Sequence, residues 1–268
     1  MLKQLQHPVN LVLGSVPVLV ALTATPSPSI AATFASSSGT AFLYEFSHAP
    51  SNVETFADAE TFTFANGGSV DAFAESDASF DTEFFPLAYN SSVAEAKGNG
   101  KQYFGRAYSE AEVIGYEFLI EAGSTFSFDF LSFLDLETSA DDPSIEMATA
   151  GGNISFFLFD DSAENIIDYF AVTGSLETAG NGDFLEVEKS SNFTVADPTE
   201  FQYFGGNQEF LLALYEGQFS REFEEDTSLT LVEVKTNYAM VKVPEPSSFV
   251  AFFIFGVTGV ALKKRKQS

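Results

Sequence analysis

The chain of 268 residues contains no cysteine and no tryptophan, and it has only two histidines. The lack of cysteine excludes disulfide bonds, thiol catalysis, and zinc or iron–sulfur sites with cysteine ligands. His7 falls in an N-terminal segment that we expect to be removed. His48 therefore remains as the one histidine for a Ser-His-Asp triad or a histidine-ligated metal. Because it sits near the start of the central region, we interpret His48 as a surface residue.

Basic residues are also scarce. The chain has 12 lysines and arginines against 38 aspartates and glutamates. Between residues 32 and 242, 7 basic residues stand against 37 acidic ones, so this region carries a net charge of −30. Such a field repels phosphate groups, which excludes nucleic-acid binding through the phosphate backbone. It suits solubility, cation binding or repulsion from anionic surfaces.

No catalytic constellation stands out among these residues. The many acidic side chains offer numerous carboxylate pairs, so a secreted carboxylate-dependent hydrolase stays open as the less favoured alternative. Sites that cleave sugars usually present stacking aromatic side chains, and the chain lacks tryptophan. We therefore predict a protein that is not an enzyme.

Residues 1–31 have the layout of a secretory signal peptide. Lys3 provides a positive start, and an apolar stretch follows over residues 9–24. The small residues Ser29 and Ala31 suit signal peptidase, so we predict cleavage after Ala31, with an uncleaved membrane anchor as the alternative. Signal peptidase and the secretion machinery are the partners that this segment implies.

Residues 243–268 join a polar box, an apolar run and a basic end. As a helix, the 14 apolar residues 249–262 would be about 21 Å long. A settled transmembrane helix needs roughly 20 residues, so this run is short for a membrane span. Snorkelling lysines lengthen this span, and four consecutive basic residues favour the cytoplasmic side. We predict a single transmembrane helix, with a buried core helix as the alternative. The predicted anchor residues are Phe249, Phe252, Phe253, Ile254, Phe255, Lys263, Lys264, Arg265 and Lys266.

This three-part tail resembles the PEP-CTERM sorting signal of exported bacterial proteins, and the box residues that carry the resemblance are Val243, Pro244, Glu245 and Pro246. The resemblance is confined to the last 26 residues. It implies processing by an exosortase, a membrane-embedded transpeptidase that cleaves near the box. It also implies an intermediate anchored in the inner membrane, later delivered to the cell surface or extracellular matrix. Exopolysaccharide is the partner that this location suggests.

Residues 32–242 predict one acidic, phenylalanine-rich domain of all-β class. Residues 125–130 alternate polar and aromatic side chains, which places Phe126, Phe128 and Phe130 on one face of a strand. The apolar phase then changes at Leu131, which predicts a bulge or a bend. Residues 154–159 are apolar on both faces and predict a central strand. Many such runs between turns rich in Gly, Asn and Pro predict an antiparallel, jelly-roll-like β-sandwich, with short helices over 140–150 or 163–169 as added elements.

Oxygen ligands for Ca²⁺ are concentrated at Asp160, Asp161 and Glu164, although their spacing matches no EF-hand loop. A solvated acidic loop is the alternative, so Ca²⁺ is the one cofactor the sequence leaves open. Carbohydrate binding is conceivable through four tyrosines, which also suit a core or cross-strand position: Tyr89, Tyr103, Tyr108 and Tyr203.

The tetrapeptide Gln-Tyr-Phe-Gly occurs at residues 102–105 and again at 202–205. A duplicated half-domain would explain it, but the flanking residues align poorly, and we interpret the match as coincidence. The sequence as a whole predicts an exported surface or matrix protein with a structural or exopolysaccharide-associated role. A carbohydrate- or Ca²⁺-binding, lectin-like module is the alternative.

Overall fold

The computed structural model describes residues 33–82, 86–163, 165–178 and 180–243. The predicted signal peptide, Glu164, the box residues that follow Val243, the predicted transmembrane helix and the basic end lie outside the described residues. Within the described ranges the chain forms strands and no helix.

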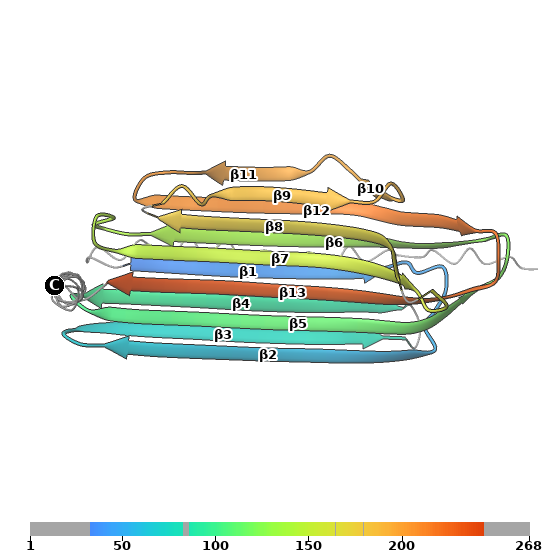
Figure 1. The fold of residues 1–268 in the computed structure, drawn as a ribbon, viewed down its shortest axis with the longest axis horizontal. Helices are drawn as coiled ribbons and strands as arrows, with labels where there is room; N and C mark the ends of the chain where they lie inside the picture. Colours follow the sequence, from blue (N-terminus) through green and yellow to red (C-terminus); the bar gives the residue numbers. More distant parts are fainter. Residues whose placement is uncertain (1–32, 83–85, 164, 179, 244–268) are drawn as a thin grey trace, which may run out of the picture.

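The strands are β1 (Thr33–Tyr44), β2 (Asn52–Ala65), β3 (Gly68–Asp81), β4 (Leu87–Gly100), β5 (Tyr103–Ile120), β6 (Ser124–Ser139), β7 (Met147–Asp160), β8 (Asn165–Thr178), β9 (Phe184–Lys189), β10 (Phe193–Val195), β11 (Thr199–Tyr203), β12 (Gln208–Phe223) and β13 (Thr227–Val243). Most are 12 to 18 residues long, so the molecule is elongated along the strand direction (Figure 1).

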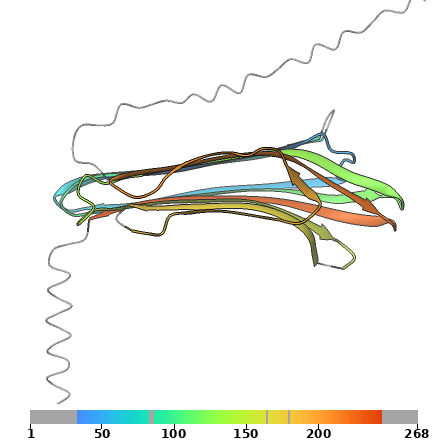
Figure 2. The same ribbon diagram turned by 90° about the horizontal axis from the view of Figure 1, so that it is seen from above.

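Two antiparallel sheets pack face to face (Figure 2). One has the strand order β10-β12-β6-β1-β4-β3, with β11 also paired to β12, and the other has the order β2-β5-β13-β7-β8-β9. Side chains of successive residues point to opposite faces of a strand, so each long strand alternates between the interior and the outer surface. In β1 this alternation is complete, because every second residue is buried from end to end.

The all-β antiparallel sandwich predicted from the sequence is confirmed, and residues 154–159 do lie in an internal strand, β7. The predicted bulge after Phe130 is wrong. The pairing of β6 with β12 continues in unbroken register through this point, because Ser132 takes the next inward position and Leu131 points outward. The predicted short helices are also wrong, since residues 140–146 form turns and irregular structure and β7 and β8 occupy residues 147–150 and 165–169.

The interior differs between the two ends of the sandwich. Toward one end it is filled by phenylalanine rings, all fully buried: Phe118, Phe126, Phe128, Phe130, Phe156, Phe170, Phe193 and Phe219. The other end is filled mainly by small side chains: Ala35, Ala94, Ala96, Ala107, Ala148 and Ala239, with Tyr103, Val241 and Val243. The sheets lie closer together at the alanine end (Figure 2), which follows from the smaller volume of the side chains between them.

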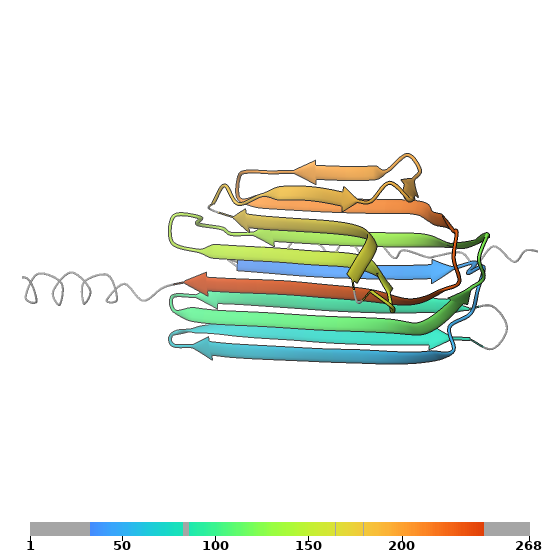
Figure 3. The same cartoon turned by 45° about the vertical axis from the view of Figure 1, so that its right-hand side comes forward.

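Both lateral edges of the sandwich expose aromatic side chains. At one edge lie β2 and β3, with Phe56, Phe62, Phe64 and Phe73 about half exposed. The short strands β9, β10 and β11 form the other edge (Figure 3). Short strands limit edge-to-edge pairing with other chains. The edge formed by β2, in contrast, is 14 residues long.

We expect Phe128→Ala to destabilise the domain strongly. The Phe128 ring is fully buried and stacks on Phe219 with a centroid separation of 5.2 Å. Removing it leaves a cavity between the sheets and should lower the free energy of unfolding by about 3–5 kcal/mol, measured by chemical denaturation. Phe62→Ala is the matched control, because that ring is 55% exposed, and it should change the free energy by no more than about 0.5 kcal/mol. Equal effects would contradict the packing described above.

Candidate functional site

A belt of polar side chains crosses the interior between the phenylalanine and alanine ends. On β13 the inward residues run from Leu229 and Leu231, through Glu233, Lys235 and Asn237, to a second apolar set at Ala239, Val241 and Val243. All three polar members are fully buried. They are buried because β1 and β4 of the opposite sheet cover the inward face of β13, while β5 and β7 flank it within its own sheet.

Asn237 ties the two sheets together at this belt. Its Nδ2 donates a hydrogen bond to Ser37 Oγ of β1, and its Oδ1 accepts one from Ser92 Oγ of β4. Ser37 Oγ in turn donates to the carbonyl of Gly151 at 2.7 Å. Buried polar groups with complete hydrogen bonding fix the register of the strands that carry them, so this part of the belt aligns one sheet on the other.

Lys235 and Glu233 differ from Asn237 in their surroundings. Within the described residues, neither Nζ of Lys235 nor the two carboxyl oxygens of Glu233 have a hydrogen-bond partner. Gly39 of β1 faces the lysine, and a Cβ at that position would lie only 2.9 Å from Cδ of Lys235. Glycine thus leaves the space through which the lysine side chain passes.

Burial changes the protonation of both groups. Loss of solvation raises the pKa of Glu233 to about 8 and lowers the pKa of Lys235 to about 7, and the attraction between the two charges opposes both shifts only in part. Each group is thereby displaced toward its neutral form near neutral pH.

Asn90 of β4 completes this side of the belt. It is fully buried, and its Nδ2 donates a long hydrogen bond of 3.5 Å to the carbonyl of Ala111 on β5. Its Oδ1 has no partner among the described residues, and the same holds for the hydroxyl groups of Ser109 and Ser132. Within the described residues, hydrogen bonds therefore satisfy the Asn237 amide of the belt, whereas Glu233, Lys235 and the neighbouring Ser109 side chain have no partner.

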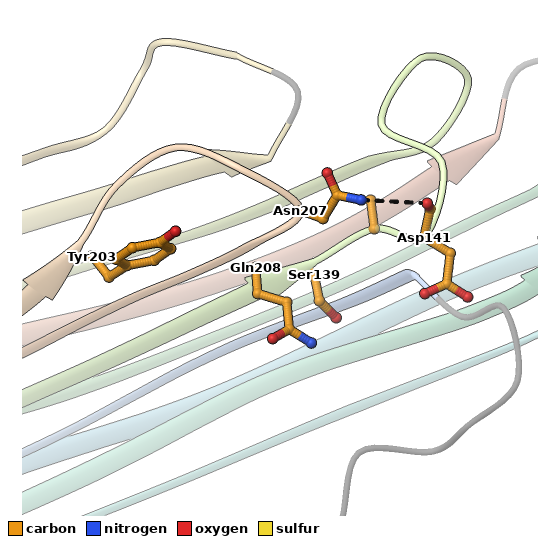
Figure 4. A pocket seen from close by; sticks show the side chains of 6 residues that line it. Ser139, Asp141, Tyr203, Asn207 and Gln208 are labelled. Atoms are coloured by element: carbon orange, nitrogen blue, oxygen red, sulfur yellow. Dashed lines mark hydrogen bonds between the residues drawn. The ribbon is translucent and has the colours of Figure 1, made fainter.

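A second candidate is a hollow of about 400 Å³ on the surface, where β6 ends and β11 turns into β12. Its lining includes Ser139, Asp141, Tyr203, Asn207 and Gln208 (Figure 4). The Tyr203 ring is 55% exposed and stacks on Phe210, with the ring centroids 6.1 Å apart. An exposed ring beside amide and hydroxyl groups has the chemistry for stacking against, and hydrogen bonding to, a sugar.

The other three tyrosines considered for carbohydrate binding lie elsewhere. Tyr103 is buried among the alanines, and burial raises its pKa to about 12. The hydroxyl of Tyr108 donates to Glu110 at 3.0 Å, and Tyr89 packs against Phe42. The hollow therefore includes Tyr203 but not these three.

The two Gln-Tyr-Phe-Gly segments occupy different environments. Tyr103 begins the internal strand β5, whereas Tyr203 ends the edge strand β11. Gly205 has a φ of +85°, in a turn, whereas Gly105 lies within a strand. The segments are not structurally equivalent, which supports coincidence over duplication.

The residues considered for Ca²⁺ lie at the end of β7. Asp160 Oδ1 accepts hydrogen bonds from the amide and hydroxyl groups of Ser162, which lower the pKa of Asp160. Asp161 Oδ2 accepts from Ser228 Oγ at 2.5 Å. Both aspartates border a hollow of about 360 Å³ that also includes Ile114, Tyr116 and Val232. In the part of the chain that the structure describes, no three His, Asp or Glu side chains converge on a common metal position.

The remaining predicted residues are placed as follows. His48 is partly buried, and its Nδ1 is hydrogen-bonded to Ser47 Oγ at 2.8 Å, with its ring against Phe126. Val243, the first residue of the box, is the last residue of β13. Among residues 33–243, with the gaps given above, no helix has the length and hydrophobicity to cross a bilayer.

Sequence reasoning missed the polar belt, although the signal was present. Alternation along residues 228–236 places Glu233 and Lys235 in phase with Leu229 and Leu231. Two ionisable residues on the apolar face of a predicted strand are a sign of a buried site.

No protein-family model matches the chain, and comparison with curated proteins and with solved structures finds no significant match.

We expect Glu233 to make the stability of the domain depend on pH. Its pKa is raised from 4.5 to about 8 in the folded state, so the stabilisation linked to its protonation is complete below about pH 4.5 and is lost as the pH rises toward 8. Relative to Glu233→Gln, the wild-type chain should lose several kcal/mol of unfolding free energy across this range.

Chemical denaturation at a series of pH values measures this difference. Glu222→Gln is the control, because Glu222 is exposed on β12. If the wild-type chain and Glu233→Gln follow parallel curves between pH 5 and 8, the carboxyl group of Glu233 is not held in its neutral form.

Proposed function

We propose that this chain is an exported, non-enzymatic protein of the bacterial cell surface or extracellular matrix, sorted through a C-terminal PEP-CTERM signal. The observation that carries the proposal is the position of Val243. It is the last residue of β13, at the centre of one sheet, so the sequence Pro244-Glu245-Pro246 follows a rigid strand without a spacer.

The two ends of the described domain meet at the alanine end of the sandwich. Tyr103 pairs in register with Val243, and its hydroxyl donates to Oγ1 of Thr33, the first described residue. An N-terminal signal peptide and a C-terminal sorting signal would therefore attach at the same end. The phenylalanine end, both outer faces and both lateral edges are left for contacts with the matrix.

The charge distribution also favours a domain that extends away from the membrane from its C-terminal attachment. A domain with a net charge of −30 is repelled by anionic lipid, whereas the basic residues 263–266 suit the cytoplasmic face of a membrane. Pro244 and Pro246 lack the amide hydrogen that a helix or an inner strand needs. Residues 244–246 would then be an extended peptide outside the membrane, which is the form that a transpeptidase of the exosortase type requires.

Sorting is tested in a host that has an exosortase. The wild-type chain should reach the surface without the basic residues 263–266, as mass spectrometry of the mature protein would show. A Pro244→Ala, Glu245→Ala, Pro246→Ala triple variant should stay in the inner membrane at its full C-terminal length. Glu224→Ala changes an exposed acidic residue of the domain and should be processed normally. Mature surface protein that still ends in residues 263–266 would argue against the proposal.

Carbohydrate binding at the Tyr203 hollow is the second candidate, and it is compatible with a place in an exopolysaccharide matrix. The exposed ring and the amide groups of Asn207 and Gln208 favour it. Calcium binding by Asp160, Asp161 and Glu164 stays the alternative within this lectin-like class. Thermal melting tests it, because a bound ion should make the melting temperature higher with Ca²⁺ than with EDTA. A polysaccharide screen that released reducing ends would favour the carboxylate-dependent hydrolase instead.

If the hollow binds sugar, Tyr203→Ala should weaken retention on purified exopolysaccharide of the host by about tenfold or more, because the stacking ring is lost. Tyr169→Ala is the matched control, since Tyr169 is a partly exposed tyrosine on β8, in the other sheet. Affinity electrophoresis in gels that contain the polysaccharide measures both. Equal mobility of the wild-type chain and Tyr203→Ala would remove the hollow from consideration.

A further inference from the structure

The sequence contains three Asn-Gly pairs, at residues 66–67, 99–100 and 181–182. An asparagine before a glycine can lose its side-chain amide without an enzyme, because glycine has no Cβ to keep its main-chain nitrogen away from the neighbouring carboxamide. Asparagine is accordingly a thermolabile residue. The intrinsic chemistry of the three pairs is the same, so the surrounding structure decides which of them reacts.

Asn66 and Gly67 form the whole connection between β2 and β3, and they cross from one sheet to the other. Both residues are exposed, and the hydrogen bond from N of Asn66 to the carbonyl of Gln102 precedes the bond that must rotate. The space around Gly67 is open, since a Cβ at this position would have no atom within 4 Å. Within the described residues, no hydrogen bond engages the carboxamide of Asn66 or the amide nitrogen of Gly67. The two groups that must react are therefore free to approach each other.

Asn99 and Gly100 are held in a ladder instead. In the pairing of β3 with β4, Asn99 is the register partner of Ser69, and Gly100 is that of Gly68. A Cβ on Gly100 would lie 2.6 Å from Cα of Gly68, so the two main chains are in close contact. Ring closure requires rotation about the Cα–C bond of the asparagine, and this end of the ladder must open before that rotation can occur.

The pair at residues 181–182 is opposed by charge. A Cβ on Gly182 would lie 2.6 Å from Oε2 of Glu177, so a carboxyl group packs directly against this glycine. The attacking nitrogen develops negative charge as it loses its proton, and a neighbouring carboxylate makes that loss harder. The loop is also tied to β8, because Oδ1 of Asp183 accepts a hydrogen bond from N of Glu177 at 2.8 Å.

We propose that Asn66 is a site of spontaneous deamidation, where the chain converts to aspartate and isoaspartate through a cyclic succinimide formed with Gly67.

The reaction needs water and no other reactant. The nitrogen of Gly67 gives its proton to solvent and attacks Cγ of Asn66. The bond from Cγ to Nδ2 then breaks, and the amide nitrogen takes up a proton and leaves as ammonia. Water opens the ring: cleavage between Cγ and the Gly67 nitrogen gives aspartate, and cleavage between the main-chain carbonyl carbon and that nitrogen gives isoaspartate. One ammonia leaves and one water enters, so nothing is oxidised or reduced.

Both products place a new carboxylate at the alanine end of the sandwich. Ala65 is the register partner of Tyr103, and Tyr103 pairs with Val243 at the end of β13. Asn66 therefore lies beside the row of strands from which the C-terminal segment leaves. In isoaspartate the main chain runs through the former side chain, so the connection between β2 and β3 gains one backbone atom. The conversion changes the charge and the length of a link between the sheets and leaves the core residues as they are.

Peptide mass spectrometry of the full chain tests the proposal, with the folded protein kept in mildly alkaline buffer and sampled over time. Cleavage after glutamate separates the three pairs into peptides 61–75, 96–110 and 178–186, each with one asparagine. Peptide 61–75 should gain about 1 Da, and its fragment ions should show both isoaspartate and aspartate. It should convert about tenfold faster than peptide 96–110 or more, because the β3–β4 ladder protects Asn99. In denaturant the two peptides should convert at similar rates.

Two variants complete the test. Asn66→Gln should abolish the conversion in its peptide, because closure of the larger ring is much slower, and it should leave the fold intact because residue 66 is exposed. Asn99→Gln is the matched control and should leave the conversion of Asn66 at the wild-type rate. The proposal is overturned if peptide 61–75 stays unchanged in the folded chain, or if it converts no faster than peptide 96–110. Conversion to aspartate alone would overturn the cyclic intermediate.

Discussion

The pairing of β13 on both sides is the constraint on which the rest of the interior depends. Side chains alternate between the two faces of a strand. Because β5 and β7 flank β13 and β1 and β4 of the opposite sheet cover it, every second side chain of β13 must enter the space between the sheets, whatever its polarity. Glu233, Lys235 and Asn237 are buried for this reason, and they divide the apolar interior into two parts. Asn237 is satisfied by hydroxyl groups of the opposite sheet, whereas the two ionisable residues are not.

The phenylalanine end and the alanine end of the interior set different separations between the two sheets. The buried phenylalanine rings are large apolar side chains that hold the sheets apart, whereas the alanine end lets them approach (Figure 2). Both termini of the described domain leave from the alanine end, next to Tyr103. The acidic outer faces keep the remaining surface soluble, and the polar hollow at Tyr203 lies where β11 turns into β12.

Local patterns in the sequence were sufficient for the fold class and for the inward phase of Phe126, Phe128 and Phe130. They failed where an inward position is polar. At Ser132 the apolar phase changes although the strand continues, so the pattern falsely indicated a bulge. The order of the strands and the Tyr203 hollow depend on contacts between distant segments, which periodicity does not encode. Tyr103 and Tyr203 show the same limit, because one tetrapeptide occurs both in a buried strand and at an exposed edge.

The position of Val243 at the end of β13 has a mechanical consequence. A protein held at its C-terminus transmits any pulling force into the strand that carries the attachment. That strand is central and antiparallel to both neighbours, so the force acts in shear along two rows of hydrogen bonds, which must break together instead of one after another. Attachment to an edge strand would let the sheet peel open. The domain is thus built to bear load from the end at which it would be tethered.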